Sequence, residues 1–352
     1  MTELLPFLKS ILSVSGLSGD ETPVQELIRE AWKPLVNQLS LSRLGSLHGL
    51  RYGTAPSPRP RVMISTHMDA IGMMVTGHVD GFLRVTQVGG VDPRILPGQP
   101  VTVHGRIALP GILVQPPARL LPAAYRDDPV PMEYLWVDTG LEPAHVADLV
   151  HVGDRVSFAQ APFELTGRAI CGHTLDDRAA VAATTVALDA LQRRNHAWDV
   201  WAVASVQEEE TLGGALTSPF EIRPDLAIVV DVTFGRGPGV SDYQTYPLGK
   251  GVVMVLGPNG HPALYKMMKE VAEKYEILTY TEVSPHMSGT DAMGIQVVAE
   301  GVPCVILGIP LRYMHTPVEV VSIKDIERTG RLIAEFIAQL EPDTIGKISW
   351  EE

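Results

Sequence analysis

Four apolar runs in this chain, each long enough for one buried strand, lead into histidine or carboxylate side chains. The runs cover residues 61–66, 200–205, 226–230 and 302–308. The polar side chains at or after their ends are His67 and Asp69, Glu208 and Glu209, Asp231, and His315. Segments whose apolar residues have helical spacing lie between the runs, and this alternation is typical of an α/β fold. Because ligands of open α/β sheets bind beyond the carboxyl ends of the strands, we expect these side chains to converge.

Three consecutive acids, Glu208 to Glu210, follow the second of these runs, and they are the least expected of the polar side chains at the strand ends. Like charges repel one another, and burial disfavours ionised carboxylates. A solvated acidic loop is the simpler interpretation, since charged residues are mostly exposed. A bound cation is the alternative, because it would compensate the negative charge.

The chain divides into an α/β part and a β-rich insertion. Residues 72–164 hold short β runs that are broken by glycine and proline. The predicted fold class is therefore α/β, with a discontinuous domain of residues 1–70 and 165–352 and an inserted β-rich domain of residues 71–164. Helices are predicted at residues 3–14, from 22 onward, and at 143–149, 175–191, 262–275, 290–298 and 323–340, and a hairpin at 38–53.

Charge and cysteine content exclude several classes of protein. The 28 basic and 41 acidic residues give a net charge of −13, which argues against nucleic acid as a partner. Cys171 and Cys304 lie outside any paired-cysteine motif, so we expect buried free thiols. The sequence shows neither a signal peptide nor a membrane span, which predicts no membrane partner and a cytoplasmic location.

Two histidines and three carboxylates form a donor set that suits divalent metal ions. The histidines are His67 and His315, and the carboxylates are Asp176, Glu209 and Asp231. Imidazole and carboxylate ligands together favour zinc, cobalt or manganese. With five ligands, one carboxylate can bridge two metal ions, an arrangement that activates water for hydrolysis.

The remaining polar residues near these ligands have natural supporting roles. Asp69 is placed to accept a ring N–H of His67 and orient it. Glu208, next to a ligand but itself free, is a candidate general base. His173, shortly before Asp176, is kept as an additional candidate ligand. The other histidines are interpreted as loop or turn residues.

Several motifs together resemble the M42 family of metallo-aminopeptidases. The resemblance covers nearly the whole chain and keeps the motifs in order. The matching stretches are Thr66–Gly72, Leu175–Arg178, Val206–Glu209, Val230–Thr233 and Arg312–Pro317, supported by 248–251, 289–292 and 301–303.

The resemblance implies a fold and a ligand set. The implied fold is a mixed-sheet zinc-peptidase domain of the phosphorylase/hydrolase-like type, with an inserted PDZ-like β-barrel domain. One metal ion would be held by His67, Asp176 and Asp231. The second would be held by Asp176, Glu209 and His315, so that Asp176 bridges the two ions.

The resemblance also implies an activity. Glu208 would act as the general acid and base, and Asp69 would orient His67. The peptide bond between Asp176 and Asp177 would be cis. The predicted protein is a dinuclear metal-dependent aminopeptidase that acts on short peptides. Relatives assemble as homo-oligomers, commonly tetrahedral dodecamers, which implies the same kind of assembly here.

The chain departs from the family pattern at three places. Ala70 stands where the family usually has an acidic residue, and Ala118 lies in a stretch that lacks a common histidine. Residues 210–213 read Glu-Thr-Leu-Gly in place of Val-Gly-Leu-Arg. None of these departures removes a ligand, so they bear on the prediction of substrate preference and assembly contacts more than on the chemistry. Glu210 has no assigned role.

Two other functions stay open at this stage. A glycosidase also uses paired carboxylates. However, neighbouring residues such as Glu208 and Glu209 point to opposite faces of an extended chain, and that function gives His67 and His315 no role. The other alternative is an inactive assembly protein of the same fold, which would be expected to have lost a ligand or the base.

Overall fold

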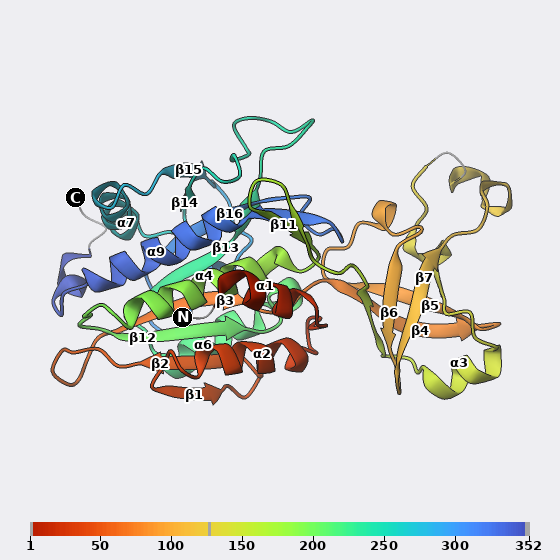
Figure 1. Ribbon diagram of the computed structural model, residues 1–352, viewed down its shortest axis with the longest axis horizontal. Helices are drawn as coiled ribbons and strands as arrows, with labels where there is room; N and C mark the ends of the chain where they lie inside the picture. Colours follow the sequence, from red (N-terminus) through yellow and green to blue (C-terminus); the bar gives the residue numbers. More distant parts are fainter. Residues whose placement is uncertain (1–2, 126–127, 349–352) are drawn as a thin grey trace.

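The computed structural model describes residues 3–125 and 128–348, which form a large mixed sheet with helices and a separate β-barrel (Figure 1). The chain enters the barrel after strand β3 and returns to the large sheet at β10. The predicted fold class, an α/β domain with an inserted β-barrel, is confirmed.

Parallel strands occupy the centre of the large sheet. Its order is β1-β2-β12-β3-β13-β16-β17-β11-β10, with β14 paired to β16 and β15 paired to β14. Strands β12, β3, β13 and β16 run parallel, so their carboxyl ends lie at one edge. The strands are β1 (Gln38–Leu41), β2 (Leu47–Arg51), β3 (Arg61–His67), β10 (Phe163–Leu165), β11 (Ala169–Gly172), β12 (Asp199–Ser205), β13 (Leu226–Phe234), β14 (Val252–Leu256), β15 (Thr279–Val283), β16 (Cys304–Arg312) and β17 (Glu319–Ser322).

Helices cover both faces of this sheet. Helices α1, α2, α4, α7 and α9 share one apolar core with side chains such as Ile64 and Ile228. Helices α6 and α8 pack on the other face, against Met63 and Val229. The alternation along each strand places successive side chains on opposite faces. The helices are α1 (Leu4–Leu12), α2 (Thr22–Trp32), α4 (Leu175–Leu191), α5 (Glu208–Thr211), α6 (Gly213–Ile222), α7 (Pro262–Lys274), α8 (Ala292–Ile295) and α9 (Ile323–Ala338).

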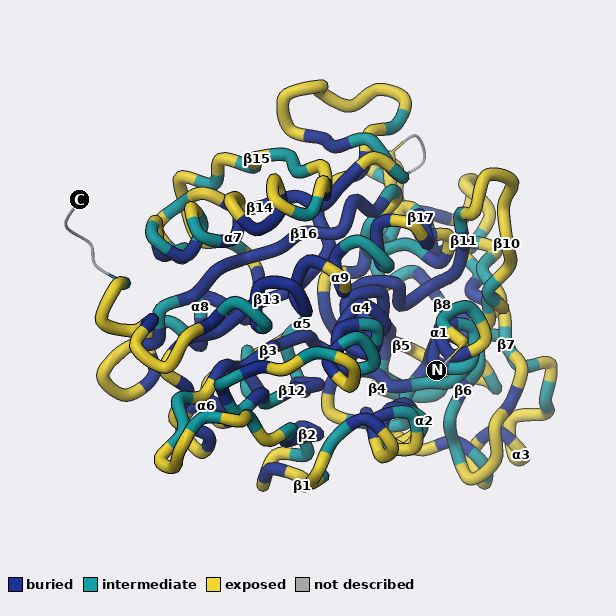
Figure 2. Tube along the Cα trace, turned by 60° about the vertical axis from the view of Figure 1, so that its left-hand side comes forward, coloured by how far each residue is buried: buried dark blue, intermediate teal, exposed yellow. Residues whose placement is uncertain are grey.

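The alanine-rich helix α4 is buried between the sheet and its neighbouring helices, as Figure 2 shows. Small side chains allow α9 to approach it closely. A Cβ atom at Gly330 of α9 would lie 2.4 Å from the carbonyl oxygen of Ala183. This tight packing holds the middle of α4 against α9, and the start of α4 reaches the carboxyl edge of the sheet.

The barrel closes in the order β4-β5-β8-β7-β6-β9 and has its own apolar core. Valine and leucine side chains point inward and alternate with exposed residues, as in β5. Its elements are β4 (Gly72–Val79), β5 (Phe82–Val88), β6 (Pro100–His104), β7 (Ala108–Val114), β8 (Trp136–Asp138), α3 (Pro143–Leu149) and β9 (Arg155–Phe158).

Two further observations concern membrane spans and the cysteines. Among the described residues, the helices lack the combination of length and apolar character that a membrane span needs. Cys171 and Cys304 are buried free thiols, as predicted.

Candidate metal centre

The five predicted metal ligands converge at the carboxyl edge of the parallel strands. His67 is the last residue of β3. Asp231 lies within β13, which continues to Phe234 because β16 pairs with it that far. Glu209 lies in the single turn of α5, just after β12, and Asp176 lies at the start of α4. His315 follows β16.

Asp176 lies between the two histidines. Its Oδ1 atom is 3.2 Å from Nε2 of His67, and its Oδ2 atom is 3.3 Å from Nε2 of His315. Burial alone would raise the pKa of Asp176, but hydrogen bonds from His315 and His67 hold it below its usual value. One carboxylate thus presents an oxygen to each histidine, which is the arrangement that a bridging ligand requires.

The other acids extend the site on both sides of Asp176. Oδ1 of Asp231 is 4.0 Å from Nε2 of His67, and Oε2 of Glu209 is 3.5 Å from Nε2 of His315. Oε2 of Glu208 lies 3.9 Å from Nε2 of His67.

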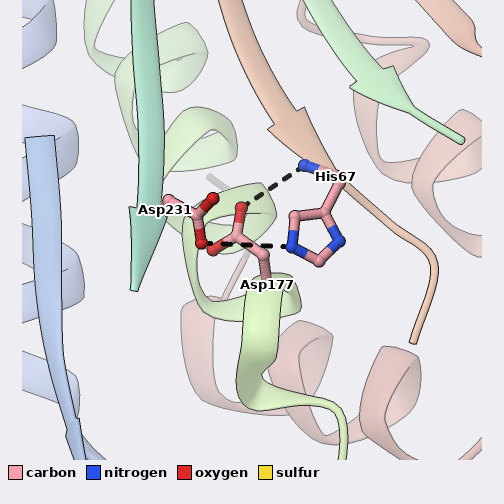
Figure 3. A group of neighbouring side chains, drawn as sticks. All are labelled: His67, Asp177 and Asp231. Carbon is pink, nitrogen blue, oxygen red and sulfur yellow. Dashed lines mark hydrogen bonds and ion pairs between the residues drawn. The ribbon is translucent and has the colours of Figure 1, made fainter. Parts of the chain in front are cut away.

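Asp177 belongs to the same cluster, although the sequence reasoning gave it no role. Figure 3 shows its carboxylate between Asp231 and the main chain of His67. Its Oδ2 atom accepts a hydrogen bond from the main-chain N–H of His67 at 3.3 Å. Potential ligand atoms of His67, Asp177 and Asp231 lie within 4.8 Å of one another, and so do those of His67, Asp176 and Glu209. The peptide bond between Asp176 and Asp177 is cis, as the family resemblance implied.

Negative charge accumulates in this cluster beyond what the two histidines can compensate. Burial, followed by repulsion from Asp176, raises the pKa of Glu209 well above its usual value. Burial also raises the pKa of Asp231. Oε1 of Glu209 and Oδ1 of Asp177 are buried and have no hydrogen-bond partner in the described part of the chain. Carboxylate and imidazole donors with uncompensated charge fit divalent metal ions.

Asp69 supports both a histidine and the acidic turn. Its main-chain carbonyl lies 3.1 Å from Nδ1 of His67, and its carboxylate lies 3.5 Å from the same atom. The carboxylate also accepts the main-chain N–H groups of Glu208 and Glu209 at 3.0 and 3.3 Å. The ring contact is therefore shorter to the carbonyl than to the predicted carboxylate, and the carboxylate fixes the turn that carries the acids.

The extended backbone predicted for Glu208 and Glu209 is wrong. Residues Glu208–Thr211 form a short helix between Gln207 and Leu212, which both have left-handed backbone conformations. The two carboxylates still diverge, because Glu208 faces His67 and Glu209 faces His315. Burial raises the pKa of Glu208 to about 7.

Glu319 is a second residue that the sequence reasoning missed. It is buried at the start of β17, where Oε2 accepts the main-chain N–H of Asp176 at 3.1 Å. Oε1 accepts the main-chain N–H of His315 at 2.9 Å. One carboxylate therefore fixes two of the predicted ligands. Its position, four residues after His315, was the available signal.

Asp291 lies beneath the site and was also missed. Its Oδ2 atom accepts hydrogen bonds from the hydroxyl groups of Ser65 and Ser205, at 2.7 and 2.6 Å. This buried carboxylate joins β3 and β12 just below the residues that carry His67 and Glu208. Its place in the stretch 289–292 that matched the family was the signal for it.

His173 does not join the cluster. Its ring packs at 6.4 Å from the ring of Phe158, and it is absent from both groups of ligand atoms within the described residues. Burial, followed by the charge of Arg178, lowers the pKa of His173 to about 3. It is best described as a neutral core histidine.

A cavity of about 1090 Å³ adjoins the segments that carry two ligands. Its wall includes Phe234 on β13 and the stretch 311–314 that leads to His315. Glu282 of β15 also lines it, and Oε2 of Glu282 accepts a hydrogen bond of 2.6 Å from the hydroxyl group of Thr233.

The sequence is similar to a known family and to known proteins. Residues 45–332 match the M42 glutamyl aminopeptidase family. The lysyl aminopeptidase of Pyrococcus furiosus is 36% identical over 95% of this chain and 97% of its own length.

The fold is similar to the folds of several solved structures. A TET aminopeptidase from a marine sediment archaeon of the Thaumarchaeota has a TM-score of 0.92 at 28% identity and covers 99% of both chains. The TET1 peptidase of Pyrococcus horikoshii, described as assembling into a tetrahedron or a large octahedral shell, has a TM-score of 0.83 at 27% identity and covers 96% of this chain and 100% of its own. A Thermotoga maritima protein described as an endoglucanase has a TM-score of 0.78 at 27% identity. The match covers 97% of this chain and 99% of that protein.

Proposed function

This chain belongs to the M42 glutamyl aminopeptidase family and is a metal-dependent aminopeptidase, and we propose that it uses two divalent ions to hydrolyse the N-terminal peptide bond of short peptides. The observation that carries the proposal is the position of Asp176, with one oxygen directed to His67 and the other to His315. A single carboxylate between two histidines suits a pair of ions better than one ion.

Two sets of side chains would hold the ions. The His67 half consists of His67, Asp176 and Asp231, and the His315 half consists of Asp176, Glu209 and His315. Zinc, cobalt and manganese all suit these donors. When bound, the ions supply Lewis acidity that polarises the scissile carbonyl group and makes water more acidic.

Glu208 is the proposed general base and acid. Its carboxylate is partly buried, with a pKa raised to about 7, and is suited to both accept and return a proton near neutral pH. It would take a proton from the attacking water and pass it to the amine that leaves. Asp69 would keep Glu208 in place through the main-chain N–H that it accepts.

The cavity beside the site would receive the side chain of the N-terminal residue. We propose a preference for lysine or arginine there, because Glu282 contributes a carboxylate to the wall. Arg312, also in the wall, already donates from Nε to the carbonyl group of Arg236. The activity named for the Pyrococcus furiosus relative supports this preference.

The substrate class is tested with aminoacyl-p-nitroanilides after reconstitution with metal. We expect lysyl and arginyl substrates to be hydrolysed faster than leucyl or glutamyl ones, and Glu282→Gln to lower kcat/KM for the lysyl substrate about tenfold, the size of one charge-assisted contact. The leucyl substrate serves as the control and should change little. Equal loss on both substrates would contradict the role of Glu282.

The assembly proposed is a homo-oligomer of the TET type. Light scattering coupled to size exclusion would measure it, and a tetrahedral shell predicts a mass twelve times that of the subunit. A mass equal to that of a single subunit would exclude this assembly.

The glycosidase alternative is separated by substrate and by chelation. An aminopeptidase cleaves aminoacyl-p-nitroanilides, loses activity with a chelator and regains it with metal. Hydrolysis of a cellulose derivative that survives chelation, with no release of p-nitroaniline, would support the alternative. The inactive assembly protein predicts no hydrolysis of either substrate.

A further inference from the structure

Two hydrogen bonds connect the inserted barrel to the candidate metal centre. Both involve the glycine pair Gly89 and Gly90, which directly follows strand β5. The main-chain N–H of Gly89 donates to Oε1 of Glu210 at 2.6 Å. The carbonyl oxygen of Gly90 lies 2.9 Å from Nδ1 of His315. Consecutive residues of the barrel thus contact the acidic turn and a predicted ligand.

The close approach of this segment requires glycine. Gly89 has a φ of +74°, and a Cβ atom there would lie 2.6 Å from Cγ2 of Ile71. A Cβ atom at Gly90 would lie 2.7 Å from Nδ1 of His315. Any side chain would push the barrel segment and the imidazole apart, so the glycine pair lets the main chain reach the ring.

The Gly90 contact determines which nitrogen of His315 faces the other ligands. A carbonyl oxygen only accepts, so Nδ1 carries the proton of this hydrogen bond, and in the neutral ring that binds a metal ion the lone pair is on Nε2. Nε2 is the atom that faces Asp176 and Glu209, at 3.3 and 3.5 Å. An outer hydrogen bond of this kind fixes both the tautomer and the orientation of a metal-binding histidine.

Glu210 is suited to hold the segment in this position. It lies next to Glu209 in α5, and its carboxylate accepts the N–H of the residue before Gly90. A hydrogen bond to an ionised carboxylate is stronger than a neutral one. Glu210, for which the sequence alone suggested no role, thus contacts the barrel segment, while Glu208 and Glu209 face the two histidines.

We propose that Glu210 is a positioning residue that secures the barrel segment Gly89–Gly90, so that the carbonyl group of Gly90 keeps His315 oriented to bind the ion of the His315 half. The inference rests on the proposed function, because it requires that half to bind a metal ion. It also couples the position of the barrel to the affinity for one of the two ions.

The test measures binding of cobalt to the apo-protein by calorimetry and by the visible absorption of Co²⁺, without reliance on activity. Glu210→Val removes the acceptor, and we expect the affinity for the ion of the His315 half to fall about tenfold, the lower end of the effect of outer hydrogen-bond partners. The affinity for the ion of the His67 half should stay within twofold. Glu210→Gln keeps a carbonyl acceptor for Gly89 and should restore most of the affinity.

Two further variants sharpen the result. Gly90→Ala should weaken the second ion more than Glu210→Val does, because the added methyl group meets the His315 ring directly. Glu270→Val, at an exposed position on α7, is the matched control and should bind both ions as the wild type does.

The outcomes separate this inference from the proposed function. If the wild type binds two ions and Glu210→Val binds both with unchanged affinity, the positioning role is wrong while the function stands. Equal weakening of both ions would also overturn it, since it would show general destabilisation. A wild type that binds no second ion would contradict the proposed function itself.

Discussion

The two halves of the proposed metal centre differ in how firmly the fold holds them. In the His67 half, His67 and Asp231 lie on adjacent strands of the sheet, and the His67 side chain is 2% exposed. In the His315 half, Glu209 lies on a single helical turn and His315 on a loop, where its side chain is 33% exposed. Side chains on rigid elements are held more precisely than side chains on loops. The ion of the His315 half should therefore be the weaker and more readily exchanged.

The two halves also differ in which contacts hold their side chains in place. The sheet itself positions the His67 half. The His315 half depends on contacts from distant segments: Glu319 accepts the main-chain N–H of His315, and Gly90 of the barrel accepts its ring N–H. The barrel therefore contributes to the centre although its own core is separate.

The largest expected effect comes from Glu208, which should serve catalysis without holding either ion. Glu208→Gln should lower kcat about a thousandfold, within the range for a general base, because the amide cannot accept the proton. Metal analysis should still find two ions per chain. Wild-type turnover in this variant would exclude Glu208 as the base.

The next largest effect compares the two histidines directly. His315→Ala should weaken one ion more than about a hundredfold, beyond the effect of an outer partner, and leave the other ion bound. His67→Ala should weaken the tighter ion and, through the shared Asp176, disturb the other. Calorimetric titration of each apo-protein with cobalt measures both affinities. Identical profiles for the two variants would remove the distinction between the halves.

The smallest effect concerns Glu319. Glu319→Gln leaves one oxygen to accept but turns an N–H group toward another N–H, so one of the two hydrogen bonds is lost. We expect about a tenfold loss of affinity for the ion of the His315 half. The matched control is Glu335→Gln, which changes a buried glutamate of α9 that pairs with Arg194, and it should leave both ions unaffected. A stronger effect of the control would contradict the role of Glu319.

Much of the site could be predicted because strand ends are visible in a sequence. The apolar runs that end near His67 and Glu208 predict the carboxyl edge of a parallel sheet, where the side chains that follow the strands converge. The barrel was visible from its short β runs. The division at residues 71 and 164 stays a prediction, and β10 (Phe163–Leu165) spans the second boundary while pairing with β11.

The parts that could not be predicted depend on contacts between distant segments. The helical turn of α5 begins after Gln207 in a left-handed conformation, which no glycine at that position signalled. Glu319 gains its role from main-chain N–H groups on two other elements, which a pattern of side chains does not reveal. The tasks of Gly90 and Glu210 likewise require the barrel to be placed against the sheet edge.

The most direct test of the central claim is anomalous diffraction from crystals reconstituted with excess zinc or cobalt. Two peaks per chain are predicted, on either side of Asp176: one beside His67 and Asp231, the other beside Glu209 and His315. Occupancy should fall first at the His315 peak as metal is withdrawn. A single peak at saturating metal, or two peaks that do not share Asp176, would contradict the account.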